Sequence, residues 1–456
     1  MSALLDHALT TADETRAIAL GPGAVHRTGS MFADLFPGQP ALVVADENTF
    51  AVAGAAVLAS LEQAGVPLAD EPFIFPGSPT LYADYPNVQV VREKLATLPA
   101  AVACSIASGT LNDITKLASG ELDRPYLNVC TAASVDGYSA FGAAITVDGF
   151  KITRTCPAPA GLVADLDHLV AAPARLTATG YGDLLEKIPA GADWLLADAL
   201  GVEPVHEVAW QLIQPTVRDV LDRPEQIAAA EPEAIEQMAE CHFLSGLAMQ
   251  ATKSSRPASG AGHQFSHTWE MEGHGLDWEP PLSHGFKVGI GTVASCALWE
   301  EALAMDVAAL DAETIVADAP SAEQVEAAVR ATLPAAMADE CVALTLAKRA
   351  EGDALRARVA RIQEVWPSLR ERCREQLVSA RGAATMLQRA GAPHHPEQIG
   401  IGMDHFRRTH LAAQRIRSRY TVLDLLADLG MLEAVVDRLF APSGFWGRRP
   451  SPDTGS

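Results

Sequence analysis

The stretch ALVVADENTFAVAGAAVLASLEQA, residues 41–64, decides the fold. It starts as a short apolar run, reaches Asp46, and continues as a helical pattern from about residue 50. A buried strand that leads directly into a helix is the repeating unit of a parallel sheet. Further strand candidates are EPFIFPG (71–77), AVACSIA (101–107) and PYLNVCTAA (125–133), with a helical VVREKLATL at 90–98. We therefore predict a doubly wound, Rossmann-like α/β domain over residues 1–165.

The character of the chain changes after residue 165. Long amphipathic stretches rich in Ala and Leu replace the strand signals, and they lie at 231–252, 286–304, 320–350, 352–380 and 405–441. Apolar residues repeating at helical spacing over such lengths indicate α-helices. We predict an all-α domain over residues 166–441. The last segment, 442–456, is rich in Pro, Gly and Ser, and we expect a disordered tail there.

Composition excludes several classes of protein. The 456 residues are 48% hydrophobic and 20% charged, which is typical of a globular chain, and the formal net charge is -23. Such a charge repels nucleic acids and anionic membranes. The seven Cys are scattered without a CxxC pair, as expected for buried thiols in a reducing compartment. We see neither a signal peptide nor a membrane span and expect a cytoplasmic protein.

Three histidines suggest a metal site. His263 and His267 are four residues apart and would share one face of a helix. A third histidine, His284, lies further along the chain, immediately before Gly285. Neutral imidazole is a common ligand of zinc-like cations, and a catalytic site adds a carboxylate and leaves one position open. Asp183 is a candidate carboxylate. Because the chain has 13 His, two of them four residues apart can also arise by chance.

Three further segments could bind a ligand or could be turns. Ser108, Gly109 and Thr110 lie where a strand meets a helix, so they could let a diphosphate approach the backbone, or simply cap the helix. Asp46, at a strand end, could accept the ribose hydroxyls of NAD or could form a turn. Asp136 also follows a strand end, and the same two interpretations apply to it.

Taken in order, the motifs carry a resemblance. They are ADENTF, SGTLNDITK, TAASVDGYSAFGAAITVDGFK, APAGLVADLD, ATGYGDLLEKIPAGADW, SRPASGAGHQFSH, LSHGFKVG and SRYTVLDLLADLGML. From about Asp46 to Leu432 the chain resembles the sn-glycerol-1-phosphate dehydrogenase family, part of the metal-dependent alcohol dehydrogenase and dehydroquinate synthase-like superfamily.

The resemblance implies a site in the cleft between a nucleotide domain and a helical domain. Asp183, His263 and His284 match the ligands of one divalent metal ion, zinc or nickel. Asp136 matches a carboxylate that contacts substrate, and His267 matches a histidine near the substrate. The positions that match the binding of NAD(H), with NADP(H) as the alternative, are Asp46, Ser108, Gly109, Thr110, Asp113, Thr131 and Ser134.

The implied reaction interconverts sn-glycerol 1-phosphate and dihydroxyacetone phosphate. Hydride would leave or reach C2 while the metal stabilises the alkoxide, and we expect the reductive direction, toward glycerophospholipid biosynthesis. For the substrate phosphate we rank Lys253 and Arg256 first, because they adjoin the metal-binding segment; Lys151 and Arg154 also lie beside matched motifs. We expect a homo-oligomer, in the first instance a dimer.

Two positions depart from the family pattern. Ala107 stands where a glycine is usual in the diphosphate loop, and Gly262 stands where a glutamate usually precedes the first metal-binding histidine. Ala107 would be strained if that position required positive φ. Gly262 removes an acidic neighbour of the metal site. Alternative functions are therefore a glycerol dehydrogenase, a dehydroquinate synthase-like enzyme, or a non-catalytic nucleotide-binding descendant, although the intact metal-ligand set speaks against the last.

Overall fold

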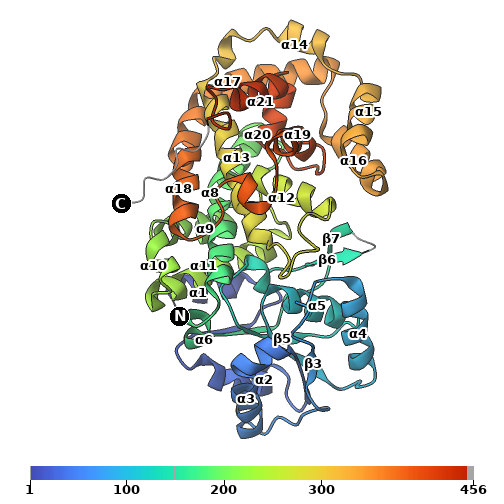
Figure 1. Ribbon diagram of the computed structural model, residues 1–456, viewed down its shortest axis with the longest axis vertical. Helices are drawn as coiled ribbons and strands as arrows, with labels where there is room; N and C mark the ends of the chain where they lie inside the picture. Colours follow the sequence, from blue (N-terminus) through green and yellow to red (C-terminus); the bar gives the residue numbers. More distant parts are fainter. Residues whose placement is uncertain (1, 148–149, 449–456) are drawn as a thin grey trace.

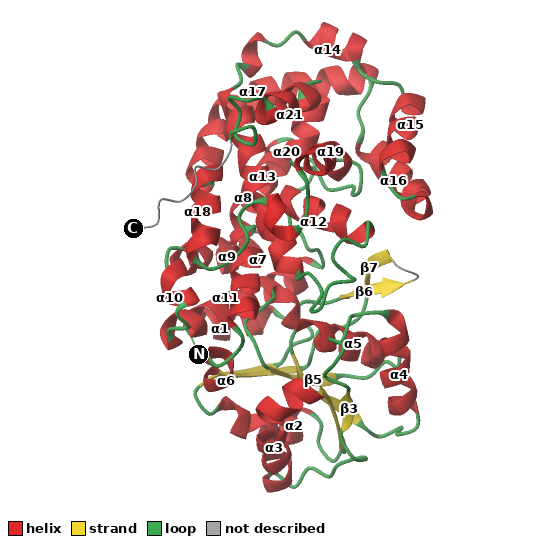
Figure 2. Cartoon of the chain, in the orientation of Figure 1, coloured by secondary structure: helices red, strands yellow, loops and turns green. Residues whose placement is uncertain are grey.

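The computed structural model describes residues 2–147 and 150–448. Figures 1 and 2 show an elongated molecule with the parallel sheet and its flanking helices at one end, the β6–β7 hairpin near the middle, and helices filling the other end. Six parallel strands form one sheet in the order β1-β8-β5-β4-β2-β3, and β6 pairs with β7 in a separate antiparallel hairpin. The strands are β1 Ala17–Gly21, β2 Ala41–Asp46, β3 Phe73–Phe75, β4 Val102–Ala107, β5 Tyr126–Cys130, β6 Ala143–Val147, β7 Phe150–Arg154 and β8 Gly161–Asp165.

Side chains of β2 alternate between the two faces of the sheet, as in any strand. Ala41, Val43 and Ala45 join the hydrophobic core on one face, and Leu42 and Val44 join the core on the other. Helices α2 (Thr28–Leu35) and α3 (Glu47–Gln63) cover the first face, whereas α4 (Tyr85–Ala96) and α5 (Gly109–Gly120) cover the second. The predicted doubly wound sheet is confirmed, including the strands at 41–45, 71–77, 101–107 and 125–133.

Part of the sheet was not predicted. Strands β1 and β8 have the sequences AIALG and GLVAD, and β8 lies between β1 and β5 inside the sheet. Both strands are only five residues long and are diluted with Ala and Gly, so their strand signal is weak. The β6–β7 hairpin extends toward the helical part and contacts α12 (Ala261–Met271).

The rest of the chain is helical, as predicted. Besides α12, its helices are α6 Leu166–Val170, α7 Ala174–Leu185, α8 Lys187–Ala199, α9 Glu207–Leu221, α10 Pro224–Ala228, α11 Pro232–Thr252, α13 His284–Ala304, α14 Ala312–Asp318, α15 Ala322–Thr332, α16 Ala335–Lys348, α17 Gly352–Gln376, α18 Ala380–Arg389, α19 Met403–Ala413, α20 Val422–Asp428 and α21 Leu432–Phe440. Short 3₁₀ turns are η1 Ala24–Arg27, η2 Asp136–Tyr138, η3 Val307–Ala309 and η4 Pro396–Ile399. The predicted stretch 320–350 divides before Pro334, because proline disfavours a helical residue before it, and 405–441 divides into three helices.

Both ends of the chain differ from the predicted domain bounds. Helix α1 (Ala3–Thr11) packs on α11, and Leu5 and Ala8 belong to the large hydrophobic core that runs through the helical part and reaches strands β1, β5 and β8. At the other end, the expected tail is ordered as far as residue 448: Trp446 is only 7% exposed and its ring lies 4.8 Å from that of Phe406. Residues 449–456 lie outside the described residues. A domain boundary near residue 165 stays a prediction.

Close helix crossings depend on glycines. A β-carbon at Gly285 would lie 2.0 Å from the carbonyl oxygen of Thr179, and one at Gly182 would lie 2.5 Å from the carbonyl oxygen of Gly285. Helices α7 and α13 therefore meet backbone to backbone. Helices α13 and α12 also meet backbone to backbone: a β-carbon at Gly291 of α13 would lie 2.2 Å from the carbonyl oxygen of Gly262 in α12. These contacts bring three helices together at one place.

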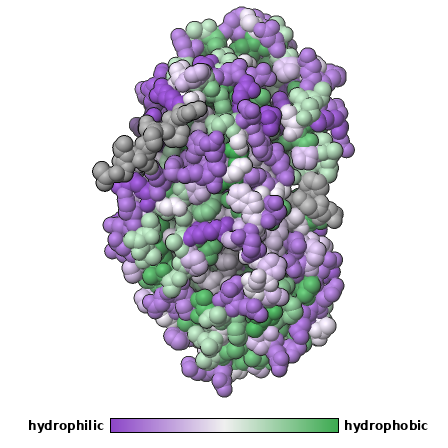
Figure 3. Space-filling model, viewed as in Figure 1, coloured by the Kyte–Doolittle hydropathy of each residue, from purple (hydrophilic) through white to green (hydrophobic). Residues whose placement is uncertain are grey.

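The loop after β3 and the loop before α13 are also in contact. The Glu279 carboxylate accepts hydrogen bonds from the backbone N–H of Thr80, at 3.1 Å, and from the Thr80 hydroxyl. All seven Cys are buried and unpaired, as expected. On the face shown in Figure 3, hydrophilic side chains are interspersed with hydrophobic patches. In the part of the chain that the structure describes, no helix has the length and apolar character needed to cross a membrane.

The close approach of α7 and α13 predicts that a methyl group added at one glycine of α13 destabilises the fold more than a methyl group added at another. Gly285→Ala should destabilise the fold by about 1–3 kcal/mol or more, because backbone on α7 blocks the new β-carbon. Gly289→Ala, in the same helix, is the control, since its β-carbon would chiefly meet the Leu387 side chain at 3.1 Å. Thermal unfolding measures both. Equal midpoints for the two variants would contradict the claim that α7 and α13 cross too closely for a β-carbon.

Candidate metal and nucleotide site

The crossing brings three predicted ligands together. Asp183 of α7, His263 of α12 and His284, the first residue of α13, each offer one ligand atom, and these atoms lie within 4.8 Å of one another. Asp183 is 1% exposed and His263 is 7% exposed, while His284 is partly buried. One carboxylate and two imidazoles form a donor set that could hold a divalent cation and leave an open position.

One carboxylate orients two of the histidines. Glu270 accepts from Nδ1 of His284 at 2.7 Å and from Nδ1 of His267 at 3.1 Å, using a different oxygen for each. Because an ionised carboxylate can only accept hydrogen bonds, both rings carry their proton on Nδ1 and present the lone pair of Nε2. Ser266 lies 3.3 Å from the same nitrogen of His284. This arrangement prepares the Nε2 atom of His284 to bind a cation.

Asp183 is held as an anion. Its Oδ1 lies 3.4 Å from Nζ of Lys187 and 3.5 Å from Nε2 of His263, and its Oδ2 accepts from the backbone N–H of Asp136 at 3.2 Å. Burial alone would raise the pKa of Asp183, but the Lys187 ammonium and then His263 hold this pKa well below its usual value. The carboxylate is thus available as a ligand at neutral pH.

Asp136 lies beside the three ligands. It begins η2, and its Oδ2 contacts Nζ of Lys187 at 2.8 Å and accepts from the Ser245 hydroxyl of α11 at 2.9 Å. Lys187 has a fully buried side chain that reaches both Asp136 and Asp183. Burial would lower the pKa of Lys187, but Asp136 and then Asp183 raise it. The structure therefore links the predicted substrate carboxylate to the predicted metal ligand through an ammonium group.

Glu186 fills the space beside Gly262. A β-carbon at residue 262 would lie 2.2 Å from Oε2 of Glu186, and the Gly262 N–H donates to Oε1 at 2.9 Å. Thr292 donates to the other oxygen at 2.9 Å. Oε1 also lies 3.9 Å from Nδ1 of His263. The acidic neighbour that the sequence seemed to lack is thus present, supplied by the α7–α8 junction instead of by residue 262.

His267 lies near the three ligands without belonging to the cluster. Its ring centre is 6.0 Å from that of His263 and 5.9 Å from that of His284. Burial, and next the positive charge of Arg417, hold the pKa of His267 well below its usual value. The ring is therefore neutral at physiological pH, with Nε2 able to accept a hydrogen bond.

The expected diphosphate loop has the predicted geometry. Ser108 precedes α5 in extended conformation, its side chain makes no capping hydrogen bond, and Gly109 and Thr110 begin the helix. A β-carbon at Gly109 would lie 3.1 Å from Val135, so a larger residue would crowd this turn. Ala107 is not among the described residues with positive φ, so its methyl group causes no backbone strain. Backbone N–H groups at a helix N-terminus suit a diphosphate.

The other expected cofactor positions have structural contacts. Asp46 caps α3 through a 2.8 Å bond from the Thr49 N–H. Asp113 accepts from the backbone N–H of Ala144 at 3.1 Å. Thr131 and Ser134 are buried in the segment after β5, where the Ser134 hydroxyl lies 3.1 Å from that of Tyr138 and the Thr131 N–H donates to a carbonyl of β4. Their roles toward a cofactor stay predictions.

The two first-ranked phosphate ligands are engaged elsewhere. Arg256 is 1% exposed, and its guanidinium donates to the carbonyl oxygens of Tyr420, at 3.0 Å, and Asp193. Lys253 is half exposed and pairs with Glu14 at 3.1 Å. Both contacts are structural, so the ranking based on sequence proximity is not supported. Arg154 lies over the Tyr85 ring at 5.4 Å, and the Lys151 side chain lies outside the described residues.

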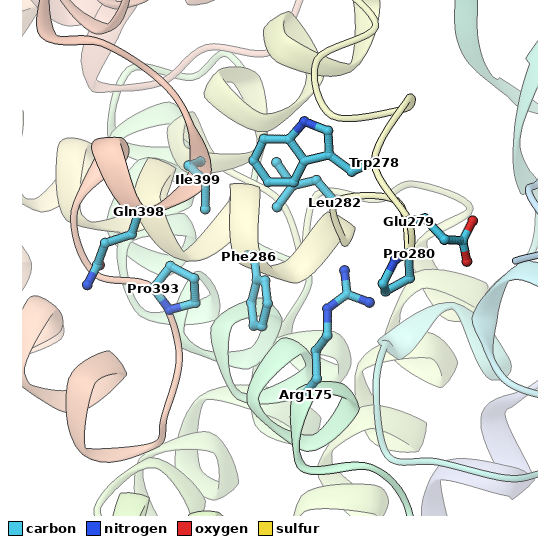
Figure 4. Close-up of a pocket in the computed structure, with 9 residues that line it drawn as sticks. All are labelled: Arg175, Trp278, Glu279, Pro280, Leu282, Phe286, Pro393, Gln398 and Ile399. Carbon is cyan, nitrogen blue, oxygen red and sulfur yellow. The ribbon is translucent and has the colours of Figure 1, made fainter.

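A separate cavity flanks α13. It measures about 540 Å³, and Figure 4 shows Arg175 reaching between Phe286 and Pro280. The Arg175 guanidinium lies 5.8 Å from the Phe286 ring centre and donates to the carbonyl of Pro281. Residues two apart on a helix project roughly 200° apart. Phe286 and His284 therefore face different sides of α13, and the cavity contains none of the three predicted ligands.

The fold and the site define a class of protein. A family model described as iron-containing alcohol dehydrogenase matches residues 19–173. A glycerol dehydrogenase structure from Schizosaccharomyces pombe has a TM-score of 0.57 to this chain at 15% identity, covering 97% of this chain and 95% of that one. The chain thus has the fold of the iron-containing alcohol dehydrogenase superfamily.

Closer relatives narrow the class. A glycerol-1-phosphate dehydrogenase of Bacillus subtilis (strain 168) is 30% identical over 392 residues, 85% of each chain. Another, from Halalkalibacterium halodurans, is 36% identical over 259 residues, covering 57% of this chain and 64% of that one. The chain belongs to the glycerol-1-phosphate dehydrogenase family.

The ligand geometry predicts a metal-dependent phenotype. Purified protein should hold about one divalent ion per chain, and His263→Ala should lose metal and activity together, because two remaining ligands rarely hold zinc against buffer. His274→Ala is a control, since that imidazole lies in the loop after α12 and contacts the carbonyl of Ile399. Elemental analysis measures the metal. Unchanged metal content in His263→Ala would remove His263 from the ligand set.

Proposed function

We propose that this chain is a metal-requiring, NAD(P)-dependent dehydrogenase that interconverts sn-glycerol 1-phosphate and dihydroxyacetone phosphate. The observation that carries the proposal is the cluster of Asp183, His263 and His284 beside Asp136, in a chain of the glycerol-1-phosphate dehydrogenase family. When bound, a divalent cation and a nicotinamide would supply the Lewis acid and the hydride carrier. We further propose a homo-oligomer, with zinc and nickel as the candidate metals.

The side chains at the site have separable roles. Within the described residues, the side-chain contacts of Asp136 use Oδ2, which leaves Oδ1 to accept a substrate hydroxyl. His267 presents Nε2 as an acceptor, because Nδ1 donates to Glu270. Asp183, with its low pKa, remains ionised. Together these groups would bind and orient a polyol and hold its hydroxyl protons at defined acceptors.

A group of arginines supports a phosphorylated substrate. Burial, followed by the positive charges of Arg256 and Arg417, lowers the pKa of Arg419 to about 9. Within residues 2–147 and 150–448, Arg419 donates only to neutral oxygens, the carbonyl of Ser259 and the hydroxyl of Ser255, both at 2.8 Å. Three guanidinium groups crowded in a chain of net charge -23 would be stabilised by a bound anion.

Arg417 is the best-placed phosphate ligand of the three. It acts electrostatically on His267, next to the proposed metal site, and on Glu270. Burial lowers the pKa of Arg417, and the carboxylates of Glu270 and Glu340 partly offset this effect. We therefore propose Arg417 in place of Arg256 and Lys253. A glycerol dehydrogenase is the alternative function, since the superfamily fold is shared with such enzymes, and the arginine group favours the phosphorylated substrate.

Asp46 predicts cofactor preference. A carboxylate there would accept ribose hydroxyls and repel a 2′-phosphate, so we expect NADH to be used better than NADPH. Asp46→Ala should narrow that difference and also lose a helix cap, at a cost of about 1 kcal/mol. Asp84→Ala is the matched control, because Asp84 caps α4 by the same kind of contact. Better turnover of NADPH than NADH by the wild type would refute the ribose role.

The proposed role of Arg417 predicts that its loss lowers kcat/KM for a phosphorylated substrate much more than for the unphosphorylated one. Arg417→Gln should lower kcat/KM for dihydroxyacetone phosphate about tenfold to a hundredfold, the effect of losing a charge-assisted contact of about 1.5–3 kcal/mol, and should leave unphosphorylated dihydroxyacetone nearly unaffected. Arg256→Gln should instead lower thermal stability and affect both substrates alike. Steady-state NADH oxidation measures each rate. Equal losses on both substrates for Arg417→Gln would make Arg417 a structural residue.

A further inference from the structure

A buried lysine lies between the two carboxylates of the site. Lys187 begins α8, and its side chain is 0% exposed. Its Nζ lies 2.8 Å from Oδ2 of Asp136 and 3.4 Å from Oδ1 of Asp183. A buried ammonium is costly unless it is paired, and here two carboxylates pair with it. No step of the proposed reaction requires Lys187, yet it contacts both the substrate side and the metal side.

The surroundings explain why an ammonium is stable there. Asp136, Asp183 and Glu186 place three carboxylates in a largely buried region, and three uncompensated negative charges would repel one another. Asp183 and Asp136 come from different elements, α7 and η2. A single charged side chain that contacts both therefore fixes their relative position before any ligand arrives.

We infer that Lys187 is a resident counter-ion: it fills the electrostatic role of the metal when the metal is absent, and weakens metal binding when the metal is present. The inference rests on the proposed metal site. The ammonium draws electron density from Asp183 and repels a divalent cation bound to the same carboxylate. It simultaneously orients Asp136 toward substrate. Lys187 is thus a positioning residue whose charge makes the metal a stronger electrophile at the expense of affinity.

Removing the charge of Lys187 should change the metal affinity in one direction if Lys187 is a counter-ion and in the opposite direction if it only supports the packing. Lys187→Met replaces the ammonium-bearing chain by an unbranched apolar chain that is one atom shorter, and so removes the charge. The metal-free variant should unfold at a lower temperature than the metal-free wild type, because two carboxylates lose their partner. Its zinc affinity should nevertheless rise, roughly tenfold to a hundredfold, the range typical of coupling between two charged ligands. Loss of packing alone would lower zinc affinity instead.

Two further variants complete the experiment. Lys187→Gln removes the charge but keeps a donor, and it serves if the methionine variant does not fold. Lys348→Met is the matched control, because Lys348 is a buried lysine that pairs with Asp424 at 2.7 Å in another region. Zinc affinity is measured by competition with a chromophoric chelator, and circular dichroism verifies the fold. With zinc saturating, kcat/KM should fall for both Lys187 variants, because Asp136 loses its charged partner.

The outcomes are distinct. Tighter zinc binding in the Lys187 variants, with unchanged binding in Lys348→Met, supports the counter-ion role. Unchanged or weaker binding in a folded Lys187 variant would overturn it while leaving the metal site intact. If the wild type itself binds no zinc or nickel, the proposed metal site fails, and the counter-ion role fails with it.

Discussion

Helices α7 and α13 approach so closely that their backbones touch, and this contact determines the geometry of the site. Gly182 and Gly285 have no room for a β-carbon, and Gly291 allows α12 to approach α13 similarly. Asp183 follows Gly182 directly, and His284 precedes Gly285 directly, so the contact that joins the helices also joins the ligands. A site built on helices that cannot slide apart is pre-organised, and little structure must form when a cation binds.

The chain as a whole is strongly negative, but a positively charged side chain is buried at the crossing of α7 and α13. The molecule carries a net charge of -23, yet the Lys187 side chain is buried between Asp136 and Asp183, and Arg256, Arg417 and Arg419 act electrostatically on one another. Buried cations are retained where they meet anions. Lys187 pairs with Asp136 and Asp183 of the chain itself, whereas we propose that Arg417 pairs with the phosphate of the substrate. This difference in partners separates the groups that organise the site from the group proposed to select a phosphorylated substrate.

The sequence predicted the parts of the fold that depend on local pattern. β2, β4 and β5 were found because each is a continuous buried apolar run, whereas β1 and β8 were missed because they are short and contain Ala and Gly. Residue type and spacing suggested a metal site, and the resemblance to the family supplied the ligand set Asp183, His263 and His284. Glu270 has a local signal, three residues after His267, but Glu186 and Lys187 act across helices, and no pattern along the chain shows which helices meet. Sequence proximity also did not show what Arg256 contacts: it adjoins the metal-binding segment, but its guanidinium donates to the carbonyl oxygens of Asp193 and Tyr420.

The central claim is that a pre-organised cluster of Asp183, His263 and His284 binds one divalent cation. Diffraction from crystals of the metal-loaded protein, recorded on both sides of the absorption edge of zinc or nickel, tests this most directly. We predict one anomalous peak per chain, about 2.0–2.2 Å from a carboxylate oxygen of Asp183 and from one ring nitrogen of each histidine. A peak bound by other residues, or no peak at the cluster in crystals grown with saturating metal, would contradict the account.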